Sequence, residues 1–124
     1  MWKAIIPALL IVIGLSGQSA AQVTAANLLG NYVVNGTELD GKAYDGPGTL
    51  AITMDKSGAL ELKWDGGNYV GVGQLVGNTL AVASHDQGKV VIMLMEVKPD
   101  GSMEGKWWQR THPGTKGTEV WKKK

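Results

Sequence analysis

The stretch Pro99-Asp100-Gly101-Ser102-Met103-Glu104-Gly105-Lys106-Trp107-Trp108 joins a tight turn to a segment with two adjacent tryptophans. Proline, aspartate and glycine favour a chain reversal, and side chains alternate between the two faces of a strand. Met103, Gly105 and Trp107 are therefore expected to share one face. The pattern predicts that Trp107 is buried in a core and that Trp108 lies on the opposite, outer face.

The same arrangement of short strand, glycine-containing turn and short strand repeats along the chain. Sixteen of the 18 glycines lie after residue 21, where they separate apolar segments of strand length. The predicted strands cover residues 29–35, 49–54, 59–64, 68–76, 79–84, 89–97, 102–110 and 117–122. Outside the first 21 residues no apolar period of 3.6 extends over a helical length, and only Val23–Leu29 suggests a short helical turn.

Eight sequential antiparallel strands in about a hundred residues predict an all-β fold. An up-and-down barrel of the lipocalin or avidin type is favoured, because closure removes the free edges of an open meander. A β-sandwich is the structural alternative, since a meander can also fold as two stacked sheets. We expect one domain, because residues 22–124 are too few for two.

The N-terminal segment has the layout of a secretory signal peptide. Lys3 supplies a positive charge, residues 4–15 are almost wholly apolar, and Ser19-Ala20-Ala21 offers small residues for cleavage before Gln22. The apolar run is too short for a membrane span, which needs about 20 residues. We therefore expect residues 1–21 to be a signal peptide and residues 22–124 to be an exported domain, periplasmic or secreted, with no membrane attachment after cleavage.

Composition excludes several classes of function. The chain has no cysteine, which rules out disulfides and thiolate metal sites. Lys3 is the only charged residue before Gln22, so residues 22–124 are formally neutral. The only basic run is the terminal Lys122-Lys123-Lys124, which is typical of a solvated end, so no nucleic-acid partner is expected.

No catalytic pattern is recognisable. His85 and His112 are both predicted in loops, without a nucleophile or a third partner beside them. These two histidines and Asp86 could hold a metal only if both loops met at one rim of the barrel, and exposed polar loop residues are the simpler interpretation. We therefore expect neither an enzyme nor a metal, and no cofactor.

The predicted inward face is rich in large apolar side chains. It holds Leu50, Ile52, Met54, Leu60, Leu62, Trp64, Met103 and Trp107. A set of this size indicates a filled lumen, which argues against an internal ligand. The glycines at 71 and 73 leave one face of their strand bare, and strand curvature is a simpler explanation than a ligand slot.

Several motifs together resemble a group of small exported bacterial β-proteins that are commonly labelled fibronectin-binding proteins or hypothetical exported proteins. The resemblance covers nearly all of residues 29–121 and is carried by Gly30-Asn31-Tyr32, Gly36, Asp40-Gly41, Tyr44-Asp45-Gly46, Trp64, Tyr69-Val70-Gly71-Val72-Gly73, Gly77-Asn78-Thr79-Leu80-Ala81-Val82, Asp100-Gly101, Gly105-Lys106-Trp107 and Gly117-Thr118-Glu119. It implies an exported, non-enzymatic β-domain. Met93-Leu94-Met95 departs from the pattern, in which a tyrosine is usual.

The orientation of the last strand decides where a partner could bind. Glu119 and Trp121 share a face, and a buried carboxylate would need an Arg or Tyr partner. Because burying a carboxylate is the costlier arrangement, we expect both residues to point outward. Ile92, Leu94, Trp108 and Trp121 would then form an outer apolar patch beside Lys106 and Arg110, and such patches are usually interfaces.

Three functions are compatible with these patterns. The favoured one is a non-enzymatic binding module that engages a protein, such as an extracellular matrix protein or another copy of itself, through the outer patch. The alternatives are a small-ligand-binding barrel and a periplasmic inhibitor of a secreted hydrolase.

Overall fold

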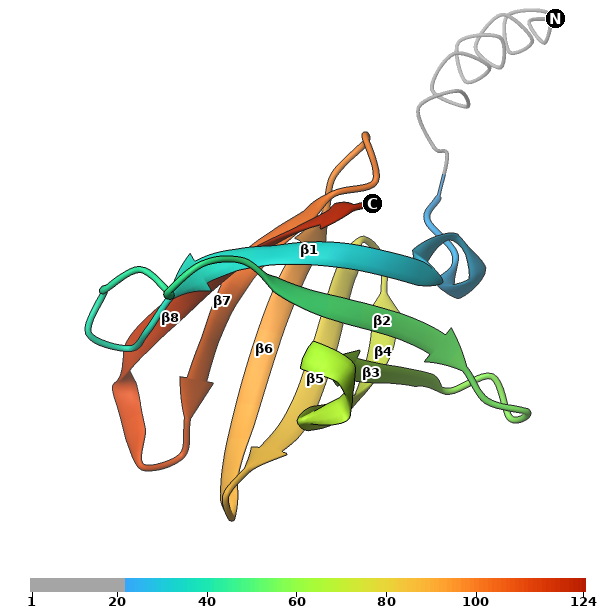
Figure 1. The fold of residues 1–124 in the computed structure, drawn as a ribbon. Helices are drawn as coiled ribbons and strands as arrows, with labels where there is room; N and C mark the ends of the chain where they lie inside the picture. The colour runs from blue at the N-terminus through green and yellow to red at the C-terminus, as the bar shows by residue number, and fades with distance from the viewer. Residues whose placement is uncertain (1–21) are drawn as a thin grey trace, which may run out of the picture.

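Each strand pairs with its neighbours in the chain, and the last pairs with the first. In the computed structural model, which describes residues 22–124, this produces a closed antiparallel barrel (Figure 1). The strands are β1 (Gly30–Thr37), β2 (Gly48–Met54), β3 (Leu60–Trp64), β4 (Tyr69–Val76), β5 (Thr79–Asp86), β6 (Lys89–Val97), β7 (Met103–Gln109) and β8 (His112–Lys123). The predicted up-and-down barrel is confirmed, and the β-sandwich alternative is wrong. The predicted signal peptide lies outside the described residues.

Two short 3₁₀ helices accompany the strands. The first, η1 (Ala25–Leu28), precedes β1 and lies within Val23–Leu29, where a short helical turn was predicted. The hydroxyl of Tyr32 donates a hydrogen bond of 2.7 Å to the carbonyl of Leu28, which fixes η1 to the barrel. The second, η2 (Asp65–Gly67), joins β3 to β4. Within residues 22–124, no helix has the length and apolarity needed to cross a bilayer.

The hairpin of β7 and β8 is longer than predicted. We expected a loop over Thr111–Lys116, but β8 already begins at His112, which pairs with Gln109. The register between the two strands shifts between Trp107 and Gln109. Backbone hydrogen bonds of a hairpin need no apolar side chains, so this polar segment gave no strand signal.

The eight residues predicted to face inward lie in the core, with one exception. Leu50, Ile52, Leu60, Leu62, Trp64, Met103 and Trp107 are buried. Met54 is 38% exposed, because it is the last residue of β2 and its side chain lies beyond the covered part of the barrel. Tyr32, Leu80, Met95 and Trp121 are also fully buried, so the barrel is densely filled over much of its length.

Gly71 and Gly73 make room for large neighbours. A Cβ atom at Gly71 would lie 3.2 Å from the Trp64 ring, and one at Gly73 would lie 3.1 Å from a methyl group of Leu62. At Gly71 and Gly73 the bare face of β4 is therefore occupied by side chains of the neighbouring strands β3 and β5.

Candidate functional site

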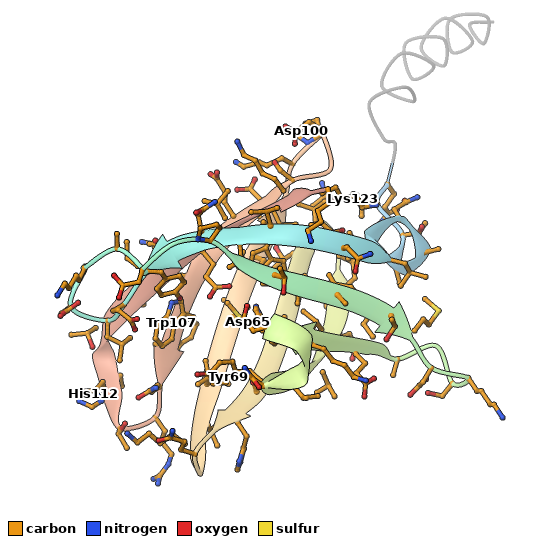
Figure 2. All side chains as sticks on the ribbon, in the orientation of Figure 1. Asp65, Tyr69, Asp100, Trp107, His112 and Lys123 are labelled. Carbon is orange, nitrogen blue, oxygen red and sulfur yellow. The ribbon has the colours of Figure 1, made fainter. Side chains whose placement is uncertain are left out.

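The barrel is hollow at one end. The connections β1–β2, β3–β4, β5–β6 and β7–β8 all lie at this end, because successive antiparallel strands return to the same rim. A cavity of about 340 Å³ lies there, which we call the mouth cavity. Its principal lining residues are Val34, Glu38, Tyr44, Asp45, Trp64, Asp65, Tyr69, Val91, Met93, Trp107 and Glu119. Figure 2 labels Trp107, Asp65 and Tyr69, which come from β7, η2 and β4.

A buried carboxylate lines this cavity. Glu119 of β8 is only 9% exposed, and each of its oxygens accepts one hydrogen bond. Oε1 accepts from Nε1 of Trp121 at 2.7 Å, and Oε2 accepts from the hydroxyl of Tyr44 at 2.8 Å. Both donors are neutral, so the hydrogen bonds of Glu119 are satisfied while its negative charge has no cationic partner among the described side chains.

The environment of Glu119 opposes its ionisation. Burial is the main cause that raises the pKa of this carboxyl group, and the negative charge of Asp65 acts in the same direction. The hydrogen bonds from Trp121 and Tyr44 lower the pKa and offset part of the effect. The pKa of the Tyr44 hydroxyl is raised in turn, first by burial and then by the negative charge of Glu119.

The indole of Trp64 contributes a buried donor without a partner. Trp64 is 8% exposed, lines the mouth cavity, and its Nε1 makes no hydrogen bond. The indole N–H also lowers the pKa of Glu119, so it lies near the carboxylate although the contact falls short of a hydrogen bond. A polar group buried in this way is uncommon in folded proteins, where nearly all such groups are paired.

Aromatic rings of the core support the cavity wall. Trp64, which lines the cavity, packs edge-on against the buried Trp121, with ring centroids 6.0 Å apart and an interplanar angle of 69°. The ring of Tyr32 also contacts Trp121, with centroids 6.5 Å apart. Closely packed side chains have few alternative rotamers, so Trp64 is held in place.

Glycines on the neighbouring strands leave the space that Glu119 and Tyr44 occupy. Glu119 is the direct cross-strand neighbour of Gly36 on β1 and of Gly105 on β7. A Cβ atom at Gly36 would lie 2.9 Å from the Tyr44 ring and 3.1 Å from Cγ of Glu119. The backbone N–H of Tyr44 donates to the Gly36 carbonyl, which holds the tyrosine over the mouth.

Trp107 forms another wall of the cavity. Its Nε1 donates a hydrogen bond of 3.1 Å to the carbonyl of Thr37 at the end of β1. Gly117, its cross-strand neighbour on β8, leaves the space that the indole occupies, because a Cβ atom there would collide with the ring. The prediction that Trp107 is buried is confirmed.

Four of the six residues predicted as an outer patch do lie together. Ile92 pairs with Trp108, and Leu94 pairs with Lys106, on neighbouring strands β6 and β7. Leu94 is 46% exposed and Lys106 is exposed, whereas Ile92 and Trp108 are half-buried. Arg110 is exposed in the turn that follows β7. Nζ of Lys116 lies 5.8 Å from the centre of the Trp108 ring and partly covers it.

The outward orientation predicted for Glu119 and Trp121 is wrong. Trp121 is completely buried and Glu119 nearly so. Two hydrogen-bond donors, the indole of Trp121 and the hydroxyl of Tyr44, offset the expected energetic cost of burying the carboxylate. Trp121 is therefore a core residue, and it takes no part in the outer patch.

The two histidines lie at the surface. His85 and His112 are both exposed. Among the side chains that the structure describes, no three of histidine, aspartate or glutamate lie close enough together to hold a metal ion.

Most residues of the mouth cavity were not identified as a site from the sequence. Tyr44 stands in a glycine-rich loop, and Trp64 was assigned to the core alone. The sequence held one indication of the site. Trp121 lies two positions from Glu119, shares its face of the strand, and carries an indole N–H that can donate to the carboxylate.

A second hollow lies at the other end of the barrel. It measures about 510 Å³ and is bordered by Val23–Ala25, Ser57–Leu60 and Gly73–Leu75. It has no aromatic or titratable lining side chain, and no unpartnered buried polar side-chain atom borders it among the described residues. The mouth cavity is therefore the better candidate, although its volume is smaller.

Comparisons with known proteins agree on the architecture. No protein-family model matches the chain, and no curated protein matches it either. Crystal structures of the fluorescent protein UnaG are similar: the wild type is 12% identical with a TM-score of 0.54, covering 82% of this chain and 100% of UnaG. A mutant of UnaG is 15% identical with a TM-score of 0.53, covering 82% and 99%. At this identity the likeness shows a shared fold, the closed antiparallel barrel.

Proposed function

We propose that the protein is a non-enzymatic, exported barrel that binds a small molecule in the mouth cavity. The observation that carries the proposal is the buried carboxylate of Glu119 on the cavity wall, whose charge has no cationic partner among the described side chains. A carboxylate can accept about four hydrogen bonds, and Tyr44 and Trp121 supply one each. A polar group of a bound ligand can therefore contact it from the cavity.

The size and the walls of the cavity support the same proposal. A volume of about 340 Å³ falls within the usual range of small-molecule sites. Trp64, Trp107 and Tyr69 offer flat apolar surfaces. Because Trp64 is packed against the buried Trp121, ligand binding would require little reorganisation of the cavity wall.

The contacts of the polar groups in the cavity favour binding over catalysis. Both oxygens of Glu119 are engaged by Trp121 and Tyr44. The hydroxyl of Ser84, also in the lining, donates to the carbonyl of Val70 at 2.9 Å. Neither arrangement aligns a nucleophile with a general base.

A matched pair of blocking variants tests the proposal. Val91 lines the cavity near its rim, whereas the adjacent Val90 points outward. Thermal-shift screening of aromatic compounds of two to three rings should identify ligands, whose affinity is then measured by calorimetry. We expect Val91→Trp to abolish binding and Val90→Trp to preserve it. The proposal fails if no compound binds, or if ligands bind both variants equally well.

A protein partner at the outer patch remains a second candidate, now confined to Ile92, Leu94, Lys106 and Trp108. The observation that favours it is one cross-strand row of Val72, Ala83, Ile92 and Trp108, which extends the patch over four neighbouring strands. Sedimentation of the wild type and of Leu94→Lys tests self-association. Concentration-dependent dimers that disappear in the variant would support this candidate, and a wild type that is monomeric at all concentrations would exclude self-association.

A further inference from the structure

We infer that the mouth cavity selects organic cations, namely amines or quaternary ammonium compounds that carry an aromatic or aliphatic body. The inference rests on the proposed function and specifies its ligand class. It follows from three features of the cavity: the sign of its charged residues, the state of Glu119, and the chemistry of its walls.

The charged residues around the cavity are all acidic. Glu38, Asp45, Asp65 and Glu119 line it, and no lysine, arginine or histidine does. The part of the chain from residue 22 onward carries as many basic as acidic residues, so this one-sided distribution is local. A concave site lined by one sign of charge concentrates ligands of the opposite sign.

Glu119 supplies a buried binding point for a positive charge. A carboxylate can accept about four hydrogen bonds, and Glu119 accepts one at each oxygen. Its donors are neutral, and the negative charge of Asp65 of η2 acts on it as well. A ligand ammonium group would provide the missing countercharge, and it would lower the pKa of Glu119, in the direction opposite to the effect of burial.

The walls are suited to a cation as well. Trp64, Trp107, Tyr44 and Tyr69 come from four different segments around the mouth. The faces of aromatic rings carry partial negative charge and attract ammonium groups, which is the basis of aromatic cages. No wall side chain offers a full positive charge to a ligand carboxylate.

The charge of the lining also decides which ligands are disfavoured. An anionic ligand would lie against four carboxylates, with no lysine, arginine or histidine in the lining to offset them. The ligand class is therefore cationic.

Three probes that differ only in charge test the inference. Naphthyloxyethylamine is cationic, naphthyloxyethanol is neutral and naphthyloxyacetate is anionic, and all three carry the same ether acceptor. Calorimetry at neutral pH should show that the amine binds at least about tenfold more tightly than the alcohol, a difference of about 1.4 kcal/mol. The acetate should bind more weakly than the alcohol.

Charge-neutralising variants localise the effect. Glu119→Gln keeps the size of the side chain and should reduce amine affinity about tenfold or more, with little change for the alcohol. Glu104→Gln removes an equal charge from an exposed position beside Lys98 and should change neither affinity. If Glu119→Gln does not fold, Asp65→Asn replaces it, with a smaller loss expected because Asp65 is exposed.

The outcomes separate this inference from the proposed function. If no compound binds, these probes included, or if the amine binds Val91→Trp as tightly as the wild type, both fail. If other compounds bind in the cavity but the amine does not, only the cation selectivity is overturned. The same holds if the alcohol or the acetate binds there as tightly as the amine, or if the amine preference survives in Glu119→Gln.

Discussion

The carboxylate of Glu119 and the indole of Trp121 form a hydrogen bond of 2.7 Å inside the barrel, two positions apart on the same strand. Residues spaced by two share a face of a strand, so the tryptophan that buries the carboxylate also supplies its donor. Tyr44 completes the arrangement from the β1–β2 connection. This relationship explains how β8 can place an acidic side chain within an aromatic core.

Removing the carboxylate should destabilise the fold more than neutralising it. In Glu119→Ala the indole of Trp121 and the hydroxyl of Tyr44 lose their partner, and each unsatisfied buried group costs about 1–3 kcal/mol. In Glu119→Gln the amide oxygen still accepts from Trp121, and the Tyr44 hydroxyl can accept from the amide nitrogen. Urea unfolding of the two variants should therefore rank alanine well below glutamine. Equal stabilities would contradict this account.

Stability should fall as the pH rises through the pKa of Glu119. Below the ordinary value of 4.5 the group is protonated in both the folded and the unfolded state. Above it the unfolded chain releases the proton first, because burial raises the pKa in the folded state. The loss is complete above the folded-state pKa. The free energy of unfolding, measured from pH 4 to pH 8, should decline in the wild type and decline less in Glu119→Gln. The same slope in both proteins would assign the effect to other groups.

Gly117 should be intolerant of even a methyl group. A Cβ atom at this position collides with the indole of Trp107, which forms one wall of the mouth, and with the carbonyl of Thr37, which accepts the hydrogen bond of that indole. We expect Gly117→Ala to cost about 1–3 kcal/mol through overpacking. Gly114 of the same strand provides the control, because a Cβ atom there meets nothing within 4 Å. Thermal unfolding of both variants gives the comparison, and equal melting temperatures would refute the packing argument.

The hydroxyl of Tyr32 should hold η1 against the barrel. It donates to the carbonyl of Leu28 at 2.7 Å, and burial raises its pKa to about 12. Tyr32→Phe leaves that carbonyl without its donor and should cost about 1 kcal/mol. Amide hydrogen exchange should accelerate at Asn27 and Leu29, whose N–H groups form the turns of η1. Amides of β5 and β6 serve as the internal reference, and unchanged exchange at Asn27 would show that η1 is held by other contacts.

Much of the architecture could be predicted from local patterns. The alternation in Leu50-Ala51-Ile52 and the turn at Pro99-Asp100-Gly101 each depend on neighbouring residues, so strand number, order and most inward faces follow from the sequence. The hairpin segment His112–Lys116 could not be recognised, because its pairing rests on backbone hydrogen bonds. Met54 was predicted to be buried but is exposed, because the alternation of side chains shows which face a residue lies on and not where the covered part of the barrel ends.

The sequence by itself determined an all-β chain of eight short strands and the shared face of Glu119 and Trp121, since both properties depend on spacing along one strand. Which way that face points was decided only by the tertiary structure. Closure of the barrel brings Tyr44 from a distant loop to within 2.8 Å of Glu119, and this donor makes burial of the carboxylate tolerable. The mouth cavity arises in the same way, because it lies between side chains from segments that only the closed sheet brings together.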